Sequence, residues 1–108
     1  MASDRRGEVW LVDLGYVAKT RPALVISVPV LDSERALVAL VPHTTSVRGT
    51  RYEVPSNVSF LKAGAFDAQN LITVSESKLL RKLGRLSDQD YEAVGKAVAN
   101  WLGLNLRA

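Results

Sequence analysis

The chain of 108 residues is the size of one domain, and its hydrophobic content of 47% is typical of a protein with a packed core. It has no cysteine and a single histidine, which excludes disulfides, thiolate metal sites and multi-histidine zinc sites. Its net charge of +3 is compatible with a nucleic-acid partner but does not establish one. We therefore expect one domain over residues 1–108, with no metal or other cofactor.

No segment of the chain has the composition of a membrane anchor or a secretory signal. No apolar run approaches the roughly 20 residues of a membrane-spanning helix. Residues 1–6 include three charged side chains and no apolar region follows them, so a signal peptide is not expected. We predict a cytoplasmic protein that does not bind a membrane.

The first half of the chain predicts three β-strands. Glu8–Leu14 is rich in β-branched and aromatic residues, which favour strands. Pro22–Val28 contains a short apolar run that suits a strand buried on both faces. Pro22 belongs at the first residue of such a strand and biases Arg21 towards an extended conformation. Ala36–Val41 is a third apolar strand that we expect Pro42 to end.

The second half predicts shorter elements around polar loops. His43–Thr50 is an almost wholly polar, hydroxyl-rich loop. The elements expected after it are a strand at Arg51–Val54, a turn at Pro55–Asn57, one or two strands in Gly64–Val74 interrupted near Gln69 and Asn70, a helical turn in Ser75–Arg81 and a strand at Lys82–Leu86.

A C-terminal helix completes the predicted fold. Ser87 and Asp90 have the spacing of a capping box, and Gly103 stands where a glycine commonly ends a helix. Apolar residues between them recur at the spacing of one helix face: Val94, Ala97, Val98, Trp101 and Leu102. Short strands followed by one amphipathic helix predict a mainly β fold, a small curved β-barrel with a terminal α-helix.

One group of residues suggests a phosphate site. If the second and third strands pair in antiparallel fashion, Arg21 and Thr44 lie at the same edge of the sheet. Arg21 would then offer a charged fork beside the hydroxyls of Thr44, Thr45 and Ser46, which suits a phosphate or a pentacoordinate phosphorane. The alternative is that Arg21 pairs with a carboxylate and the hydroxyls make turn hydrogen bonds.

A second group is basic and aromatic. Lys19, Arg48 and Arg51 mix charge with the rings of His43 and Tyr52, as single-stranded nucleic-acid grooves do. The alternative is a solvated loop in which His43 is simply exposed. Histidine can otherwise act as an acid or base near neutral pH.

Several segments in order resemble one protein family. Arg6–Trp10 and Asp13–Leu14, followed by Arg21–Ser27, are similar to the PemK/MazF-type toxin endoribonucleases of type II toxin–antitoxin modules. Val41–Ser46 resembles the Pro-x-Thr-Ser segment of that family. The later match comprises Gln69, Thr73, Val74, Leu79 and Gly84–Leu86.

This resemblance implies an SH3-related barrel that works as a homodimer and cleaves single-stranded RNA without a metal. The family's catalytic arginine falls on Arg21, and its catalytic threonine on Thr44 or Thr45. The RNA 2′-OH attacks the adjacent phosphorus, leaving a 2′,3′-cyclic phosphate and a 5′-OH. A cognate antitoxin covers the RNA groove. The residues expected to support the substrate are Lys19, Ser46, Arg48, Arg51 and Gln69.

Departures and alternatives accompany the resemblance. The connection from Leu14 to Arg21 is shorter than in many members and lacks their glutamate. Because an arginine stays charged in proteins, we expect Arg21 to stabilise the phosphorane, with His43 as a candidate acid or base. Toxins of the same fold that bind DNA gyrase through a surface such as Trp101 are one alternative function, and an inactive RNA-binding module is another.

Overall fold

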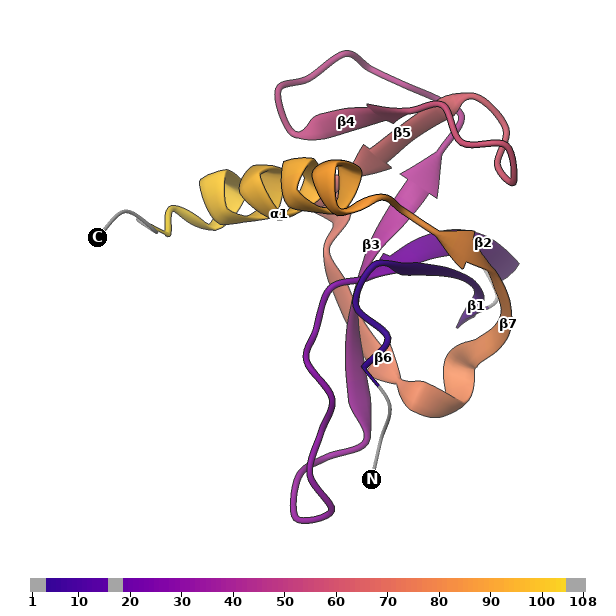
Figure 1. The fold of residues 1–108 in the computed structure, drawn as a ribbon, viewed down its shortest axis with the longest axis vertical. Helices are drawn as coiled ribbons and strands as arrows, with labels where there is room; N and C mark the ends of the chain where they lie inside the picture. Colours follow the sequence, from indigo (N-terminus) through magenta and orange to yellow (C-terminus); the bar gives the residue numbers. More distant parts are fainter. Residues whose placement is uncertain (1–3, 16–18, 105–108) are drawn as a thin grey trace.

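The computed structural model describes residues 4–15 and 19–104, which form seven strands, two short 3-10 helices and one α-helix (Figure 1). The connection from Leu14 to Arg21 therefore lies partly outside the described residues. The strands are β1 (Glu8–Gly15), β2 (Lys19–Val25), β3 (Leu37–Thr44), β4 (Glu53–Ser56), β5 (Gly64–Asp67), β6 (Ile72–Ser75) and β7 (Leu79–Arg85). The helices are η1 (Ala68–Asn70), η2 (Glu76–Lys78) and α1 (Asp88–Leu102).

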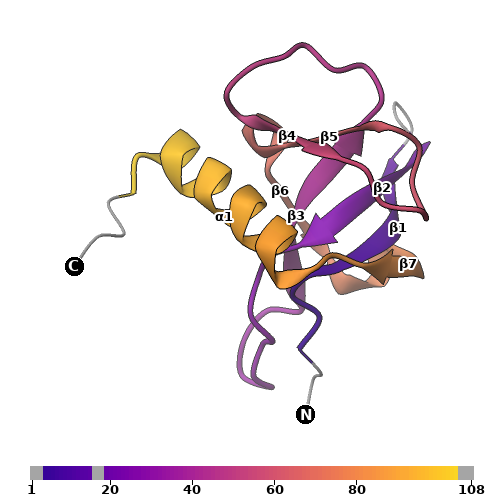
Figure 2. The ribbon, with the colours of Figure 1, turned by 45° about the horizontal axis from the view of Figure 1, so that its top comes forward.

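The strands form an antiparallel sheet in the order β4-β5-β3-β2-β1-β7. The long strand β3 carries two partners along one edge, with β6 pairing from Leu37 to Leu40 and β5 pairing at His43 and Thr44. Figures 1 and 2 show the strands curling around one another, with α1 lying across them. The mainly β, barrel-like fold with a terminal helix is confirmed.

Side chains of β2 enter two separate core clusters, as expected for a strand covered on both faces. Leu24 packs with Val41, Phe66 and Val94 on the side of α1. Ala23 and Val25 point the other way into a second cluster with Val12, Val38 and Leu40. Because successive residues of a strand face opposite sides, the side chains of Ala23, Leu24 and Val25 pack on both faces of β2. Arg21 is half-buried and lies next to this packed segment.

The predicted end of the third strand is wrong. The strand continues through Pro42 and includes His43 and Thr44. Pro42 lies between the β6 and β5 ladders, so its missing N–H leaves no bond unmade on that edge. Thr44 is therefore held by a strand and not by a loop.

The neighbouring boundaries also differ from prediction. The second strand was expected at Pro22–Val28 but spans Lys19–Val25, since Pro22 pairs with Leu11 inside the ladder. The turn predicted at Pro55–Asn57 is wrong, because Pro55 and Ser56 belong to β4. This strand lies at the sheet edge, where proline is tolerated.

The terminal helix agrees with its sequence signals. The Ser87 hydroxyl accepts a hydrogen bond from the Asp90 N–H at 3.1 Å, and Gly103 adopts φ +70° after the last turn. Val94, Ala97 and Val98 are buried against the sheet. Trp101 and Leu102 continue this face past the sheet and are about half exposed. No helix in the described residues is long and apolar enough to cross a membrane.

Candidate active site

The pairing of β2 with β3 brings Arg21 and Thr44 to the same edge of the sheet. Ala23 of β2 pairs with Pro42 of β3. Arg21 and Thr44 lie just beyond this pair, at the same end of the two strands. Two hollows of about 440 Å³ each open there. Arg21, Thr44 and Ser46 line both of them and form a ridge between the two.

We call the two sides the polar hollow and the apolar hollow. The polar hollow is also lined by Pro42, Arg48, Thr50, Glu53, Asp67, Gln69, Asn70 and Trp101. The apolar hollow is also lined by Leu11, Pro22, His43, Thr45, Phe60, Leu61, Lys62, Arg81 and Leu83.

Arg21 is half-buried and has no carboxylate within ion-pair distance in the described part of the chain. The alternative in which it pairs with a neighbouring acid is therefore not what the structure contains. Its guanidinium is positioned to receive an anion from either hollow.

The two threonines differ in their surroundings. Thr44 is half-buried and lines both hollows, and its Oγ1 accepts a hydrogen bond from the Ser46 N–H at 3.0 Å. This bond occupies a lone pair and leaves the hydroxyl proton available for donation. Thr45 is exposed and lines only the apolar hollow, not the polar one. Because Thr44 lines both hollows together with Arg21, the geometry favours Thr44 over Thr45 as the hydroxyl that would contact the same bound group as Arg21.

Glu53 organises the loop that follows β3. The residue is 9% exposed, and its carboxylate accepts hydrogen bonds from the backbone N–H groups of Arg48 at 3.1 Å and Thr50 at 2.9 Å. These bonds from Thr50 and Arg48 lower the pKa of Glu53. The Glu53 carboxylate therefore fixes the backbone of the loop at Arg48 and Thr50, and both residues line the polar hollow.

His43 is buried, contrary to the expectation of an exposed histidine in a polar loop. It is 4% exposed, its Nε2 lies 2.9 Å from the Ser56 Oγ, and its ring meets Phe66 edge to face at 5.2 Å. Burial lowers the pKa of His43, so the ring is neutral at pH 7. It reaches the site only from the side of the apolar hollow.

Gln69 lies in η1 and lines the polar hollow. Asp67 caps this short helix by accepting hydrogen bonds from the Gln69 N–H at 3.1 Å and the Asn70 Nδ2 at 2.8 Å. The arrangement presents two amide side chains and a carboxylate in one place. Such groups can read the edge of a base by hydrogen bonding.

Two predicted site residues lie outside both hollows. Lys19 is exposed at the start of β2, with φ +59°. Arg51 packs its guanidinium over the Tyr52 ring at 4.7 Å, and Tyr52 in turn meets Trp101 at 5.3 Å. These two cations can therefore contact a long ligand only beyond the ridge.

A family model described as a PemK-like, MazF-like toxin of type II toxin–antitoxin systems matches residues 5–102. The chain belongs to this family. Among curated relatives, Endoribonuclease MazF1 of Mycobacterium bovis and Endoribonuclease MazF4 of Mycobacterium tuberculosis are each 32% identical over 104 residues. The alignment covers 96% of this chain and 97% of each relative.

Solved structures of toxins are also similar to this family member. An endoribonuclease from a mycobacterial species, in complex with its cognate antitoxin, superposes with a TM-score of 0.82 at 28% identity, covering 97% of this chain and 100% of that one. The Mycobacterium tuberculosis toxin MazF-mt6 gives a TM-score of 0.78 at 28% identity, covering 91% and 98%.

Sequence reasoning about this toxin missed several residues that line the hollows. Glu53 falls within the strand predicted at Arg51–Val54, although Thr50 and Glu53 have the Thr-x-x-Glu spacing at which a glutamate accepts a hydrogen bond from the threonine N–H. Asp67 precedes a short helix in the same way. Phe60, Lys62 and Arg81 gave no local signal, because only the folded sheet brings them beside Arg21.

No group of three or more histidine, cysteine, aspartate or glutamate side chains able to hold a metal ion occurs within residues 4–15 and 19–104. What the site offers is a fixed cation, hydroxyl donors and amides around two hollows. These are groups that bind and stabilise a phosphodiester and its transition state.

Proposed function

We propose that this toxin cleaves single-stranded RNA, with Arg21 and Thr44 acting on the scissile phosphate. The endoribonuclease activity named for its relatives extends to this chain through shared family and nearly full-length similarity. The observation that carries the assignment of residues is the ridge, where Arg21, Thr44 and Ser46 stand together between two hollows.

In the proposed reaction the 2′-oxygen attacks the adjacent phosphorus and the bond to the 5′-oxygen breaks. The 2′-OH gives up its proton and the departing 5′-oxygen takes one from water, so the products are a 2′,3′-cyclic phosphate and a 5′-OH. Negative charge grows on the non-bridging oxygens, where Arg21 neutralises it and the Thr44 and Ser46 hydroxyls donate hydrogen bonds. Arg48 and Gln69, in the polar hollow, hold the flanking RNA.

His43 is the proposed acceptor of the 2′-OH proton. Its lowered pKa keeps the ring unprotonated at neutral pH, which a general base requires. Its bond to Ser56 and its contact with Phe66 support a fixed ring orientation.

The remaining assignments concern partners and location. The solved relative in complex with its cognate antitoxin supports an antitoxin partner for this chain. We further propose that the toxin works as a homodimer in the cytoplasm, where its RNA substrate is found. The exposed Lys19 and Arg51 contact RNA beyond the ridge, and Thr45 contacts it in the apolar hollow.

The test compares the wild-type protein with Arg21→Ala, Thr44→Val and Thr45→Val on a long single-stranded RNA in EDTA. We expect discrete cuts with 2′,3′-cyclic phosphate ends from the wild type and the Thr45 variant. Loss of about 100-fold or more is expected for Arg21→Ala and Thr44→Val. Arg35→Ala removes an exposed arginine from another loop and serves as the control.

Full cleavage by Arg21→Ala would refute the assigned role of the ridge. If the wild type cut none of several RNAs, the activity itself would be refuted, and binding to DNA gyrase or to RNA without cleavage would become the better assignments.

A further inference from the structure

We propose that the apolar hollow is a nucleotide subsite next to the scissile phosphate, with Arg81 and Lys62 binding the RNA backbone and Phe60 contacting the base. This inference rests on the proposed function, since it assigns the hollow to the same RNA that Arg21 and Thr44 cleave. It commits to one occupant, a nucleotide of the single-stranded substrate.

The position of Arg81 follows from strand register. Leu11 of β1 pairs with Pro22 of β2 on one side and with Arg81 of β7 on the other. Arg21 precedes Pro22 and lies in the adjacent row, where it pairs with Val12. Arg81 of β7 nevertheless lines the same hollow as Arg21, although the two residues are 60 positions apart in the chain.

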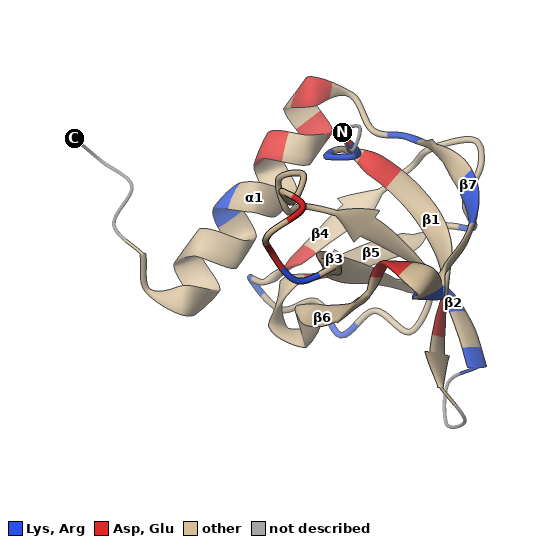
Figure 3. Cartoon of the chain, turned by 90° about the horizontal axis from the view of Figure 1, so that it is seen from below, with Lys and Arg blue, Asp and Glu red and all other residues tan. Residues whose placement is uncertain are grey.

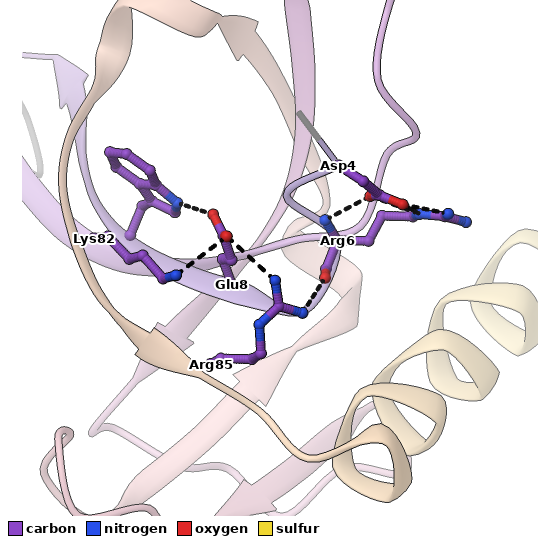
Figure 4. Close-up of polar contacts among 6 residues, drawn as sticks. Asp4, Arg6, Glu8, Lys82 and Arg85 are labelled. Atoms are coloured by element: carbon purple, nitrogen blue, oxygen red, sulfur yellow. Dashed lines mark hydrogen bonds and ion pairs between the residues drawn. The ribbon is translucent and has the colours of Figure 1, made fainter. Parts of the chain in front are cut away.

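The other cations of β7 are already engaged. Glu8 receives Lys82 Nζ and Arg85 Nη2, each at 3.2 Å, and the Trp10 Nε1–H at 3.0 Å (Figure 4). Arg85 also donates to the Arg6 carbonyl oxygen at 3.1 Å.

Arg81 and Lys62 form no ion pair in the described part of the protein, and both are exposed. Figure 3 shows basic segments along β7 and at the start of β2. Unpaired cations beside a hollow are the expected partners of phosphate groups.

Part of the lining of the hollow is apolar. Phe60, Leu61 and Leu83 line it. The Phe60 ring lies directly against the backbone of β7, because a Cβ built on Gly84 would come within 2.6 Å of two ring atoms and 2.7 Å of a third. Aromatic contact with a base tolerates any sequence and is typical of sites for single-stranded nucleic acid.

The polar hollow differs from the apolar hollow in the charge of its lining. Glu53 and Asp67 line the polar hollow and disfavour phosphate there, whereas no carboxylate of the described residues lines the apolar hollow. This contrast favours the apolar hollow as the place where backbone phosphates beside the cut are held. Hydrogen-bond reading of bases then belongs to the amides of the polar hollow.

The experiment measures binding of a single-stranded oligonucleotide made uncleavable by 2′-deoxy substitution, together with cleavage of the all-RNA version. The variants are Arg81→Ala, Lys62→Ala and the double variant. Each has a matched control that removes the same charge elsewhere, Arg35→Ala and Lys96→Ala. Arg81→Lys tests for rescue by a residue that keeps the charge.

We expect each single variant to bind about fivefold to tenfold more weakly at 0.1 M salt, with KM raised and kcat within about threefold of the wild type. The slope of log K against log salt should decrease by about 0.7 for each phosphate that the variant no longer neutralises. Arg81→Lys should restore the slope, and the controls should match the wild type.

The outcomes separate the subsite from the proposed function. If the wild type cleaves RNA while the double variant binds and cuts like the controls, the subsite is refuted and the function stands. If no protein cleaves but the double variant loses binding, the cleavage function is refuted, and the hollow stands only as a site that binds single-stranded nucleic acid. Altered sedimentation of the variants together with lost binding would also overturn the subsite, since the cations would then serve assembly.

Discussion

At the scale of single residues, Glu53 gives the loop after β3 its shape. The loop from Thr45 to Thr50 contains no regular element, and Gly49 adopts φ +78° within it. The backbone N–H groups that this conformation leaves unpaired point at the Glu53 carboxylate. The Glu53 side chain thus accepts the hydrogen bonds that a neighbouring strand would otherwise accept from this loop. The position of Arg48 depends on these bonds.

Replacing this carboxylate should loosen the loop in a pH-dependent manner. Because hydrogen bonds from Thr50 and Arg48 lower the pKa of Glu53 in the folded protein, its stabilisation is complete above the ordinary value of 4.5. It is lost as the pH falls through the lowered value. Urea unfolding should show Glu53→Gln to be less stable than wild type at pH 7, with a difference that shrinks below pH 4.5.

The matched control is Glu92→Gln, which removes an exposed carboxylate from α1. Hydrogen exchange should accelerate at the Arg48 and Thr50 amides in Glu53→Gln and stay unchanged in the control. Equal protection in both variants would mean that the loop holds its shape without the carboxylate.

His43 offers a second test at this scale. It is the only histidine in the chain, so its imidazole signals in the proton NMR spectrum need no assignment. Because burial lowers the pKa of His43, the signals should titrate with a midpoint below the ordinary value of 6.5. The unfolded protein in urea is the reference, and equal midpoints in both states would contradict the buried environment.

At the scale of elements, the approach of β5 to β3 is the contact on which the position of Thr44 depends. Gly64 lies so close to β3 that a Cβ would meet the Thr44 carbonyl oxygen at 2.2 Å and the His43 Cε1 at 2.8 Å. The space is closed by backbone, which cannot move aside as a flexible side chain would.

Gly64→Ala should therefore destabilise the protein by about 1–3 kcal/mol through overpacking. It should also lower RNA cleavage, because β3 must shift at Thr44. The measurements are the free energy of unfolding in urea and the cleavage rate under conditions where the variant is folded.

The same substitution elsewhere provides the comparison. Gly95 lies in the middle of α1 with nothing within 4 Å of a built Cβ. Gly95→Ala should raise stability by about 0.5–1 kcal/mol, since alanine favours the helix. If both substitutions had the same sign, the close approach at Gly64 would not be the cause.

At the scale of the whole molecule, the apolar third strand gives no argument for a dimer, because its side chains serve the core of the chain. Val38, Leu40 and Val41 are buried within the chain itself. Large apolar side chains are instead exposed between β2 and β3 and at the end of α1: Val28 at 60%, Leu31 at 67%, Leu102 at 50% and Leu104 at 55%. Exposed apolar surface of this kind is typical of association sites.

The proposed homodimer should be visible in solution. Sedimentation equilibrium at micromolar concentration should give about twice the chain mass of 11.8 kDa. Raised salt should not dissociate an apolar interface, whereas it weakens RNA binding. A monomeric mass across the micromolar range would contradict the dimer.

Much of this toxin was predictable from local sequence because local physics decides it. The helix was found from Ser87, Gly103 and the spacing of Val94, Ala97 and Val98, since capping and periodicity involve neighbouring residues. The double-faced burial of β2 followed from its apolar run. Arg21 and Thr44 emerged as a pair because antiparallel strands bring particular ends together.

The tertiary structure alone decided what surrounds that pair. Whether Pro42 ends a strand depends on which neighbour lies opposite it, and whether His43 is exposed depends on Ser56, Gly64 and Phe66 packing around it. The freedom of Arg81 to bind a phosphate depends on Glu8 having taken Lys82 and Arg85. These are contacts between residues that are distant in the sequence, so they cannot be predicted from composition or from the spacing of neighbouring residues.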